Sequence, residues 1–286
     1  MKIAVTGADG QLGVDIVAAL KKSDLLPLTY PDFDIRDRSR AGRAIVDFAP
    51  DWVINSAAMT HVDNCELDDA AAFAVNTLGA RYAAEAAEKS GAALIYLSTD
   101  YVFDGRKLSP YIESDPPAPL NVYGLSKLSG EYASRAACSR TYILRTCGLY
   151  GLSPCWGKGT NFVDKMLKLA ADRKRIQVVG DEVLTPTFTE DVAAQILALI
   201  ESPPAPDIYH ATNDGYCSWY EFAGEIFSIA GLDIALEEIS AKTWNAQARR
   251  PAYSVLENKA LKDNGLDVFP HWRDALRRYL GKRRKG

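Results

Sequence analysis

The sequence predicts an α/β protein in which a doubly wound parallel sheet is joined to a smaller mixed α/β region. Apolar strand-like runs alternate with helical segments through the first half of the 286 residues, as they do where crossover helices join parallel strands. Three glycines separate the first strand from the first helix. The alternation degrades after about Gly148, so we expect most of the sheet within the first 150 residues.

The predicted strands are short apolar runs, and the segments between them have helical periodicity or helix-favouring alanines. The expected strands are Ile3–Val5, Leu25–Thr29, Trp52–Asn55, Ala93–Ser98 and Tyr142–Arg145. The expected helices are Val14–Lys22, Ala41–Ala49 and Ala70–Ser90, with another that begins near Tyr123.

The second half predicts a return to the sheet and then a separate region. Its expected elements are a helix at Phe162–Ala171, a strand at Ile176–Val179, and helices at Thr189–Glu201 and Trp219–Ala230. Three prolines between positions 203 and 206 mark a break. We expect one domain of residues 1–150, to which 172–202 return, and a second domain of residues 151–171 and 203–286.

The composition excludes several classes of protein. Hydrophobic residues make up 48%, charged residues 24%, and the net charge is −4, which argues against disorder and against a broad nucleic-acid-binding surface. No apolar run approaches the roughly 18 residues of a membrane span. The five cysteines and three histidines lack metal-ligand spacing and C-x-x-C pairs. We therefore expect free thiols, no metal and a cytoplasmic location.

The C-terminal tail is unusually basic. Seven Lys or Arg residues lie between Arg273 and Lys285, against the single acid Asp274. Two interpretations stay open, a solvated chain end and a contact for an anionic partner.

Gly7, Gly10 and Gly13 have the spacing of a Rossmann-type dinucleotide loop, directly after a strand and at the start of a helix. In such a loop the first glycine permits the tight turn, the second lets a pyrophosphate approach, and the third lets the helix pack closely. The helix N-terminus attracts the anion. The second strand ends without the acid that would bind an NAD ribose, and Arg36, with Arg38 and Arg40, follows. This pattern favours NADPH and leaves NADH open.

Tyr123 and Lys127 form a Tyr-x-x-x-Lys pair, which a helix places on one face. A nearby ammonium lowers the pKa of a tyrosine toward neutral pH, where the phenol can act as an acid or base. Thr99 ends a buried strand at the edge where α/β sheets bind ligands, and its hydroxyl can hydrogen-bond a substrate oxygen beside Tyr123.

Together these features resemble the extended short-chain dehydrogenase/reductases, and most closely the dTDP-4-dehydrorhamnose reductase family. The resemblance covers nearly the whole chain. The matching segments are Gly10–Gly13, Asn55–Ala58, Ser98–Gly105, Pro119–Gly124, Asn161–Val163, Cys217–Ala223, Arg250–Pro251 and Pro270–Trp272.

The resemblance implies an NADPH-dependent oxidoreductase that reduces the 4-keto group of dTDP-4-dehydro-6-deoxy-L-mannose to give dTDP-L-rhamnose. Tyr123 would protonate the new alkoxide oxygen, Lys127 would hold the nicotinamide ribose, and Thr99 would orient the keto oxygen. For the substrate it further implies Asp100 beside the sugar, with Asn161 and Arg250 (or its neighbour Arg249) toward the diphosphate. The residues expected to contact the cofactor are Gly7, Gly10, Gln11, Leu12, Gly13, Asp34, Ile35, Ala58, Met59, Thr60, Tyr123 and Lys127.

The sequence departs from the family at the substrate pocket, where Cys147-Gly148 replaces the usual Ser-Trp. The loss of an indole removes a large apolar wall. Two alternatives therefore stay open. One is a reductase or epimerase of another 4-keto-6-deoxy sugar nucleotide. The other is a non-catalytic regulatory subunit like that of methionine adenosyltransferase. Whether the protein forms a homodimer is also open.

Overall fold

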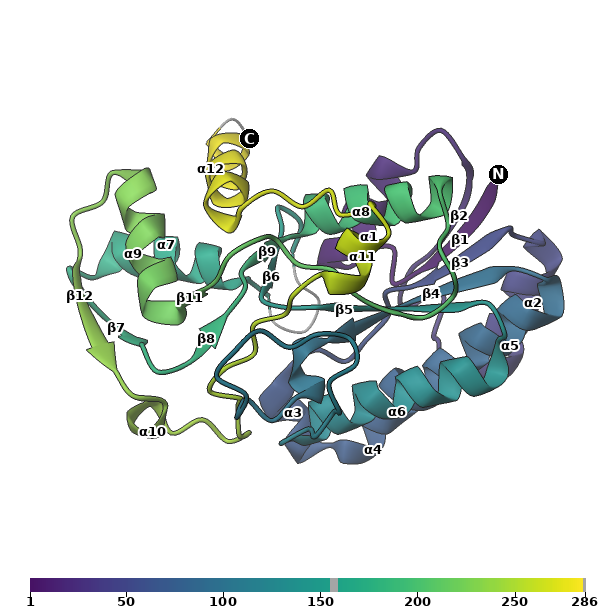
Figure 1. The fold of residues 1–286 in the computed structure, drawn as a ribbon, viewed down its shortest axis with the longest axis horizontal. Coiled ribbons are helices and arrows are strands. Elements are labelled where there is room, and N and C mark those ends of the chain that lie inside the picture. Colours follow the sequence, from purple (N-terminus) through teal and green to yellow (C-terminus); the bar gives the residue numbers. More distant parts are fainter. Residues whose placement is uncertain (155–158, 285–286) are drawn as a thin grey trace.

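The computed structural model describes residues 1–154 and 159–284, and a six-stranded parallel sheet lies at its centre (Figure 1). The strand order is β10-β5-β4-β3-β1-β2. This order reverses at β1, which pairs with β2 on one side and β3 on the other. The predicted fold class is confirmed. The strands are β1 (Lys2–Thr6), β2 (Asp24–Leu28), β3 (Trp52–Asn55), β4 (Ala93–Thr99), β5 (Thr141–Thr146) and β10 (Ile208–His210).

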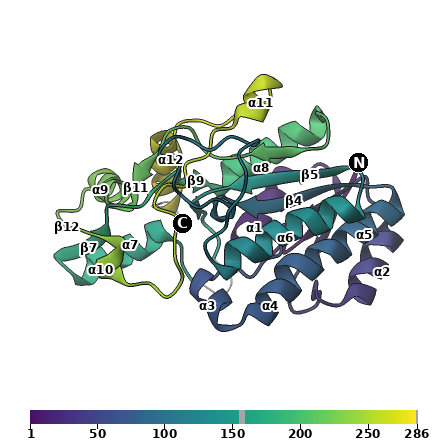
Figure 2. The same cartoon turned by 60° about the horizontal axis from the view of Figure 1, so that its bottom comes forward.

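Helices cover both faces of the sheet. They are α1 (Gln11–Ala19), α8 (Thr189–Glu201), α2 (Arg38–Phe48), α5 (Ala80–Ser90) and α6 (Val122–Ala137). Successive strand residues point to opposite faces, so Ile3 packs with α1 and α8 while Ala4 packs with α2 and α5. Figure 2 shows α2, α5 and α6 side by side on the second face.

The predicted helix at 70–90 is divided into three elements, α4 (Asp69–Phe73), a π-helical segment η1 (Ala74–Gly79) and α5. Asn76 in η1 is buried, and its Nδ2 donates to the Met59 carbonyl (3.1 Å) and to Ser126 Oγ (2.9 Å). Its Oδ1 accepts from the Met59 N–H (2.8 Å). The π-helical segment therefore carries an amide that holds the chain after β3, and π-bulges are frequent at functional sites.

The later segments build a smaller lobe around an aromatic core that includes Tyr150, Phe188, Phe222, Trp272 and Tyr279. Its helices are α7 (Phe162–Asp172), α9 (Trp219–Ala230), α10 (Ala241–Trp244) and α12 (Trp272–Arg283). Its paired strands are β6 (Leu149–Tyr150) with β9 (Thr187–Phe188), β7 (Arg175–Val179) with β12 (Ala235–Ile239), and β8 (Val183–Leu184) with β11 (Cys217–Ser218). Three short helices lie elsewhere, α3 (Val62–Leu67), η2 (Asp100–Val102) and α11 (Lys259–Asp263).

The strand pairing differs from the expected domain boundaries in two places. Within 172–202, α8 packs against α1, but β7 pairs with β12 because Ile176 and Val178 are buried in the smaller lobe. Within 203–286, β10 joins the large sheet beside β5, and Leu261 of α11 packs into the core beneath it. The chain crosses between the lobes more often than expected, and the division into two domains stays a proposal.

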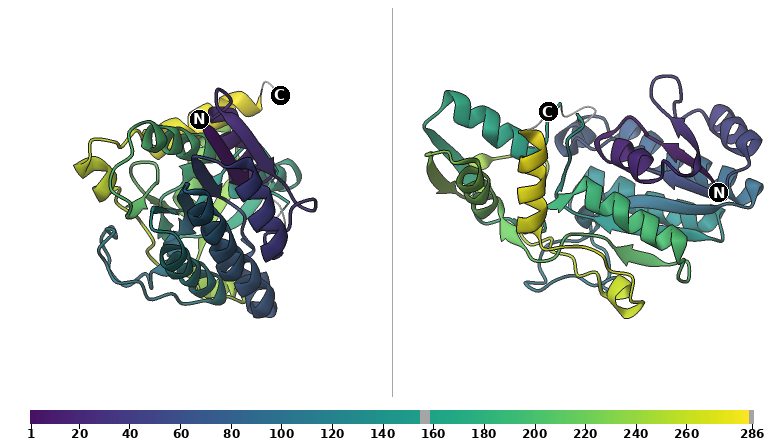
Figure 3. Two further views of the ribbon diagram at one scale, coloured as in Figure 1. Left: turned by 90° about the vertical axis from the view of Figure 1, so that its right-hand side faces the viewer. Right: turned by 90° about the horizontal axis from the view of Figure 1, so that it is seen from above.

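Up to Arg284 the basic tail is a helix and not a frayed end, and its Lys and Arg side chains lie on the solvent-exposed face of that helix. Residues 272–283 form α12 (Figure 3), and the apolar side chains of this helix are buried in the smaller lobe. Its charges pair with acids of this same chain. The pairs are Arg278 with Asp191 (2.6 Å), Lys282 with Glu190 (2.5 Å) and Arg283 with Asp164 (3.0 Å). Lys285 lies outside the described residues.

A buried ion pair fastens α6 to the sheet. Arg145 on β5 donates to Glu131 on α6 through Nε (2.9 Å) and Nη2 (2.7 Å), and both side chains are 2% exposed. Ser98 on β4 donates to the same carboxylate (2.5 Å). Because α6 also carries Tyr123 and Lys127, this contact sets the position of the predicted catalytic helix.

Removing one partner of this pair should be costly. Arg145→Met or Glu131→Gln should each lower the free energy of unfolding by about 3–5 kcal/mol, since a buried charge then loses its partner. The double variant Arg145→Met with Glu131→Leu should recover most of that loss. Urea denaturation followed by circular dichroism measures all three.

The exposed pair Arg175–Glu237 (2.9 Å; side chains 70% and 36% exposed) is the matched control. Arg175→Met should cost less than about 1 kcal/mol. Similar losses at both pairs would contradict this account.

Candidate functional site

A cavity of about 730 Å³ opens at the carboxyl ends of the central strands. It runs from the loop after β1, past the ends of β3 and β4, to Trp219 in the smaller lobe. Apart from Arg250 and its alternative Arg249, every residue predicted for the catalytic, cofactor and substrate sites lines it. These are Gly7, Gly10, Gln11, Leu12, Gly13, Asp34, Ile35, Ala58, Met59, Thr60, Thr99, Asp100, Tyr123, Lys127 and Asn161.

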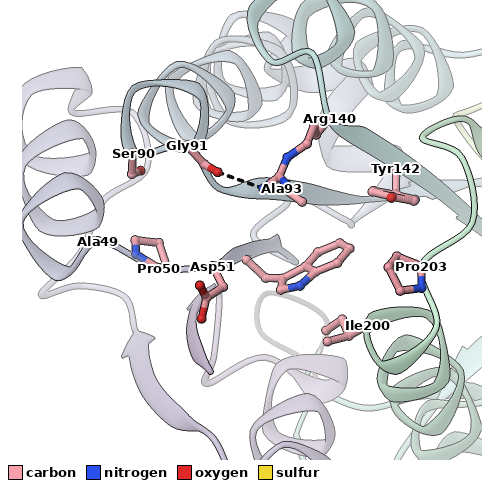
Figure 4. A pocket seen from close by; sticks show the side chains of 11 residues that line it. Ala49, Pro50, Asp51, Ser90, Gly91, Ala93, Arg140, Tyr142, Ile200 and Pro203 are labelled. Atoms are coloured by element: carbon pink, nitrogen blue, oxygen red, sulfur yellow. Dashed lines mark hydrogen bonds between the residues drawn. The ribbon is translucent and has the colours of Figure 1, made fainter.

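A second hollow, of about 490 Å³, lies at the opposite edge, where β3, β4 and β5 begin (Figure 4). Tyr142 and Pro203 line it, and Arg140 donates to the Gly91 carbonyl (2.8 Å). None of the predicted site residues lines this hollow. Since open α/β sheets bind ligands at the carboxyl ends of their strands, the first cavity is the candidate site.

The glycine loop has the shape that a dinucleotide phosphate needs. Gly7 has φ +65°, and a Cβ there would lie 2.8 Å from the Ala57 nitrogen. A Cβ on Gly13 would overlap the Gly7 carbonyl oxygen, so only glycine allows α1 to begin this close to β1. Gly10 caps α1 without a side-chain hydrogen bond. The backbone N–H groups in the first turn of α1, a helix of nine residues, therefore lie at the cavity wall, which is formed there by the backbone of the glycine loop.

Among the three arginines expected near a 2′-phosphate, only Arg36 lines the cavity. It pairs with Asp34 (2.6 Å), and this contact lowers the pKa of the Asp34 carboxyl. Arg38 pairs with Glu85 on α5 (2.8 Å). The site therefore offers one guanidinium and one carboxylate, side by side, to the adenosine end of a dinucleotide.

Tyr123 is fixed by a close packing of α6 on η2. Asn121 caps α6 by accepting from the Gly124 N–H (2.7 Å), and a Cβ on Gly124 would overlap the Tyr101 carbonyl. The Tyr123 ring consequently lies edge-on to Tyr101, with centroids 5.8 Å apart. Sequence reasoning missed Gly124 because a helical glycine gives no signal of what packs against it.

Lys127 is buried, 3% exposed, one turn further along α6. Its Nζ donates to the Leu97 carbonyl (2.5 Å) and lies 4.1 Å from the centre of the Tyr96 ring. Burial lowers the pKa of Lys127 to about 7, and the charge of Glu131 opposes the shift. The lysine is thus held where its charge state changes near neutral pH.

Thr99 ends β4 and belongs to a buried polar cluster. Its Oγ1 donates to Asp100 Oδ1 (3.0 Å) and accepts from the Tyr101 N–H (3.2 Å). Cys147 donates to Asp100 Oδ2 (3.1 Å). Sequence reasoning identified Thr99 and Asp100 but not the thiol behind them, which reaches Asp100 only because β4 and β5 are paired.

The backbone conformation at Gly148 explains why this position carries no indole side chain. Its φ is +57°, and a Cβ there would lie 2.8 Å from Leu184 Cδ1 and 2.9 Å from the Thr185 carbonyl. No larger side chain fits on this backbone. Leu184 and Trp219 line the same region of the cavity, so the apolar wall is supplied by the smaller lobe.

Two predicted substrate residues are held by other parts of the protein. Arg250 does not line the cavity, since its guanidinium pairs with Asp63 (3.0 Å) and donates to the Ala248 carbonyl (3.0 Å). Asn161 does line it, but its side chain caps α7 and donates to the Gly151 carbonyl (2.9 Å). Their contact with a substrate stays a prediction.

A glycine loop at a β1–α1 junction, a Tyr-x-x-x-Lys pair and a strand-end threonine converge on one cavity. This combination defines the extended short-chain dehydrogenase/reductase class. The model of the RmlD substrate binding domain matches residues 1–284. The chain therefore belongs to the dTDP-4-dehydrorhamnose reductase family.

Relatives with curated names match along most of their length. The spore coat polysaccharide biosynthesis protein SpsK of Bacillus subtilis (strain 168) is 40% identical, with coverage of 99% of this chain and 98% of the relative. The dTDP-4-dehydrorhamnose reductase of Sinorhizobium fredii is 38% identical, with 98% and 97% covered. The dTDP-4-keto-6-deoxy-D-glucose reductase of Streptomyces niveus is 38% identical, with 95% and 94% covered.

A solved structure is similar over the whole fold. The dTDP-4-dehydrorhamnose reductase of Bacillus anthracis, crystallised in complex with NADP, has a TM-score of 0.94 and 36% identity. The match covers 98% of this chain and 99% of that one.

A methyl group at Gly13 should damage the phosphate loop. Gly13→Ala should lower the free energy of unfolding by roughly 1–3 kcal/mol through overpacking, and it should weaken NADPH binding. Gly42→Ala on α2 is the matched control, because nothing lies within 4 Å of a Cβ there. That change should raise stability by about 0.5–1 kcal/mol. Urea denaturation and NADPH titration compare the two, and equal stability would count against the packing argument.

Burial of Lys127 should make stability depend on pH. Its pKa falls from 10.5 to about 7 on folding. Between these values the unfolded chain binds a proton that the folded chain lacks, so wild-type stability should rise with pH relative to Lys127→Met, by roughly 1.4 kcal/mol per unit. Below pH 7 both states hold the proton, and the difference should be flat. Urea denaturation of both proteins from pH 6 to 9 measures this, and a difference that falls with rising pH would refute it.

Proposed function

We propose that this protein reduces the 4-keto group of dTDP-4-dehydro-6-deoxy-L-mannose to give dTDP-L-rhamnose, with NADPH as the reductant. The observation that carries the proposal is the single cavity that joins the glycine loop to Thr99, Tyr123 and Lys127. The NADP complex of the Bacillus anthracis relative supports the choice of cofactor.

The residues present fit a dinucleotide. The backbone of Gly7, Gly10 and Gly13 and the first amides of α1 would hold its diphosphate, and Arg36 would meet a 2′-phosphate. Ala58, Met59 and Thr60 follow β3, and Asn76 holds Met59 through its backbone. When bound, NADPH supplies the hydride that reduces the ketone.

The chemistry of the chain itself is proton transfer and orientation. The Tyr123 phenol donates its proton to the oxygen of the former ketone as that oxygen gains negative charge, and the phenolate that results lies on the same helix face as Lys127. The Lys127 ammonium stabilises this phenolate. Thr99 fixes the oxygen from the β4 side. Leu184 and Trp219 exclude water from the sugar end of the cavity.

A second candidate is the reduction of a different dTDP-4-keto-6-deoxy sugar. The backbone at Gly148 and the wall formed by Leu184 and Trp219 favour it, because they replace a side chain that the family uses beside the sugar. The Streptomyces niveus relative is named for such a sugar at comparable identity. A panel of 4-keto sugar nucleotides, each tested with NADPH and NADH, separates the two candidates.

We further propose a cofactor domain built on the large sheet and a substrate-binding domain built on the smaller lobe.

A homodimer is proposed through the exposed apolar side chains of Leu67, Leu78, Leu125 and Tyr132 on α3, η1 and α6. Sedimentation equilibrium tests this proposal. A cytoplasmic location fits the four described cysteines, which are all free thiols, and cell fractionation tests it. Among the described residues, no helix is long and apolar enough to cross a membrane.

The proposed reaction makes a direct prediction. The purified protein should oxidise NADPH only when a dTDP-4-keto-6-deoxyhexose is supplied, as followed by loss of reduced-nicotinamide absorbance. Tyr123→Phe should lower the rate by at least about 100-fold, because the proton donor is lost, while NADPH still binds. Tyr132→Phe, on the exposed side of the same helix, is the control.

Equal turnover by Tyr123→Phe and Tyr132→Phe would refute the catalytic assignment. Failure of every keto sugar in the panel, together with tight binding to another enzyme, would instead favour the regulatory interpretation.

A further inference from the structure

A buried acid lies directly behind the proposed catalytic threonine. Asp100 is 4% exposed, and Thr99, Cys147 and Ser254 all hydrogen-bond to its carboxyl group. The three partners come from different segments: the end of β4, the residue after β5, and the loop that precedes α11. Thr99, Asp100 and Ser254 line the cavity, whereas Cys147 is not among its lining residues. The thiol therefore acts on the site through Asp100 and through Ser254, whose Oγ lies 3.8 Å from Cys147 Sγ.

The hydrogen bonds of Thr99 show why the state of Asp100 matters. A threonine hydroxyl has one proton and two lone pairs. Tyr101 N–H occupies one lone pair. If Asp100 is ionised it can only accept, so the Thr99 proton must point to Asp100 Oδ1, 3.0 Å away. Thr99 is then left with one lone pair, which cannot bond a ketone oxygen.

We propose that Asp100 holds a proton that sets the direction of the Thr99 hydrogen bond, and that Cys147 is a positioning residue that sets how tightly this proton is held. When Asp100 carries the proton it donates to Thr99 Oγ1, and the Thr99 proton is free to bond the ketone oxygen. When Asp100 is ionised, Thr99 can only accept, which suits the hydroxyl of the alcohol. This inference rests on the proposed reduction.

The surroundings of Asp100 favour the protonated form. Behind it lies an apolar cluster that includes Val102, Phe103 and Leu184. Burial raises the pKa of Asp100, and hydrogen bonds from Ser254, Cys147 and Thr99 oppose the shift. Burial and the nearby Asp100 also raise the pKa of Cys147, which keeps it a neutral donor.

The other ionisable groups on this side are Tyr101, Glu182, Arg250 and Lys127. Glu182 and Arg250 from the smaller lobe act on Tyr101 with opposite signs. Lys127 on α6 donates to the Leu97 carbonyl. A carboxyl pKa that is raised keeps the acid form up to a higher pH. The efficiency of ketone reduction should therefore be full below that pKa and fall as pH rises through it.

Two substitutions of Cys147 test this in opposite directions. A hydroxyl donates to a carboxylate more strongly than a thiol, so Cys147→Ser should stabilise the ionised form and move the fall in kcat/KM to lower pH by about one unit. Cys147→Ala removes the thiol donor to Asp100 and should move the fall in kcat/KM to higher pH by a similar amount. Cys138→Ser and Cys138→Ala, at a buried thiol that bonds the Ala92 carbonyl, are the matched controls and should not move it.

A readout that needs no turnover accompanies the kinetics. The infrared C=O band of protonated Asp100, identified by its loss in Asp100→Asn, should titrate in the ligand-free protein and move with both Cys147 variants. A band that titrates at an ordinary carboxyl pH, or a pH profile that neither Cys147 variant moves, would overturn the inference. If no keto sugar is reduced, the proposed function fails. A band that still shifts with Cys147 then supports the proton switch and removes only its assignment to reduction.

Discussion

The contact on which the site most depends is the buried pair between Arg145 and Glu131. It joins β5 to α6 in the interior, and Ser98 adds β4 to the same carboxylate. Strand β4, which ends at Thr99, and strand β5, which Cys147 follows, are thereby fixed against the helix that carries Tyr123 and Lys127. Ion pairs of this kind contribute little net stability compared with apolar packing, but removing one partner leaves a buried charge uncompensated. The positions of β4, β5 and α6 around the cavity are linked through this contact.

The smaller lobe is held to this frame by charge as well as by its aromatic core. Asp63 on α3 binds both the Ala248 N–H (2.9 Å) and the Arg250 guanidinium. On the other side, α12 pairs with the first turn of α8. Both contacts are partly exposed, so each is worth little alone. Together they join the lobes on either side of the cavity.

The sequence was sufficient to predict what depends on local pattern. The strand ends, the glycine loop and Tyr123 with Lys127 follow from periodicity and spacing, and the family resemblance supplied the reaction. The sequence did not predict which distant segments pair with one another. Nothing local indicates that β7 pairs with β12, that Asn76 turns inward from a π-helical segment, or that acids of α7 and α8 neutralise the basic tail. The role of Cys147 could not be predicted from the sequence, because it depends on a hydrogen bond to the Asp100 carboxylate, which follows a different strand.

Gly148 limits how this site can be altered. Its positive φ and the backbone atoms of Thr185 and Pro186 that surround it leave no room for a side chain. A single substitution cannot restore the missing indole without reshaping the turn between β5 and β6. We expect natural divergence or engineering to change the sugar preference through substitutions at Leu184 and Trp219 instead. On the proposed function, the choice of sugar is thereby assigned to the smaller lobe, apart from α6 and β4, which carry Tyr123, Lys127 and Thr99.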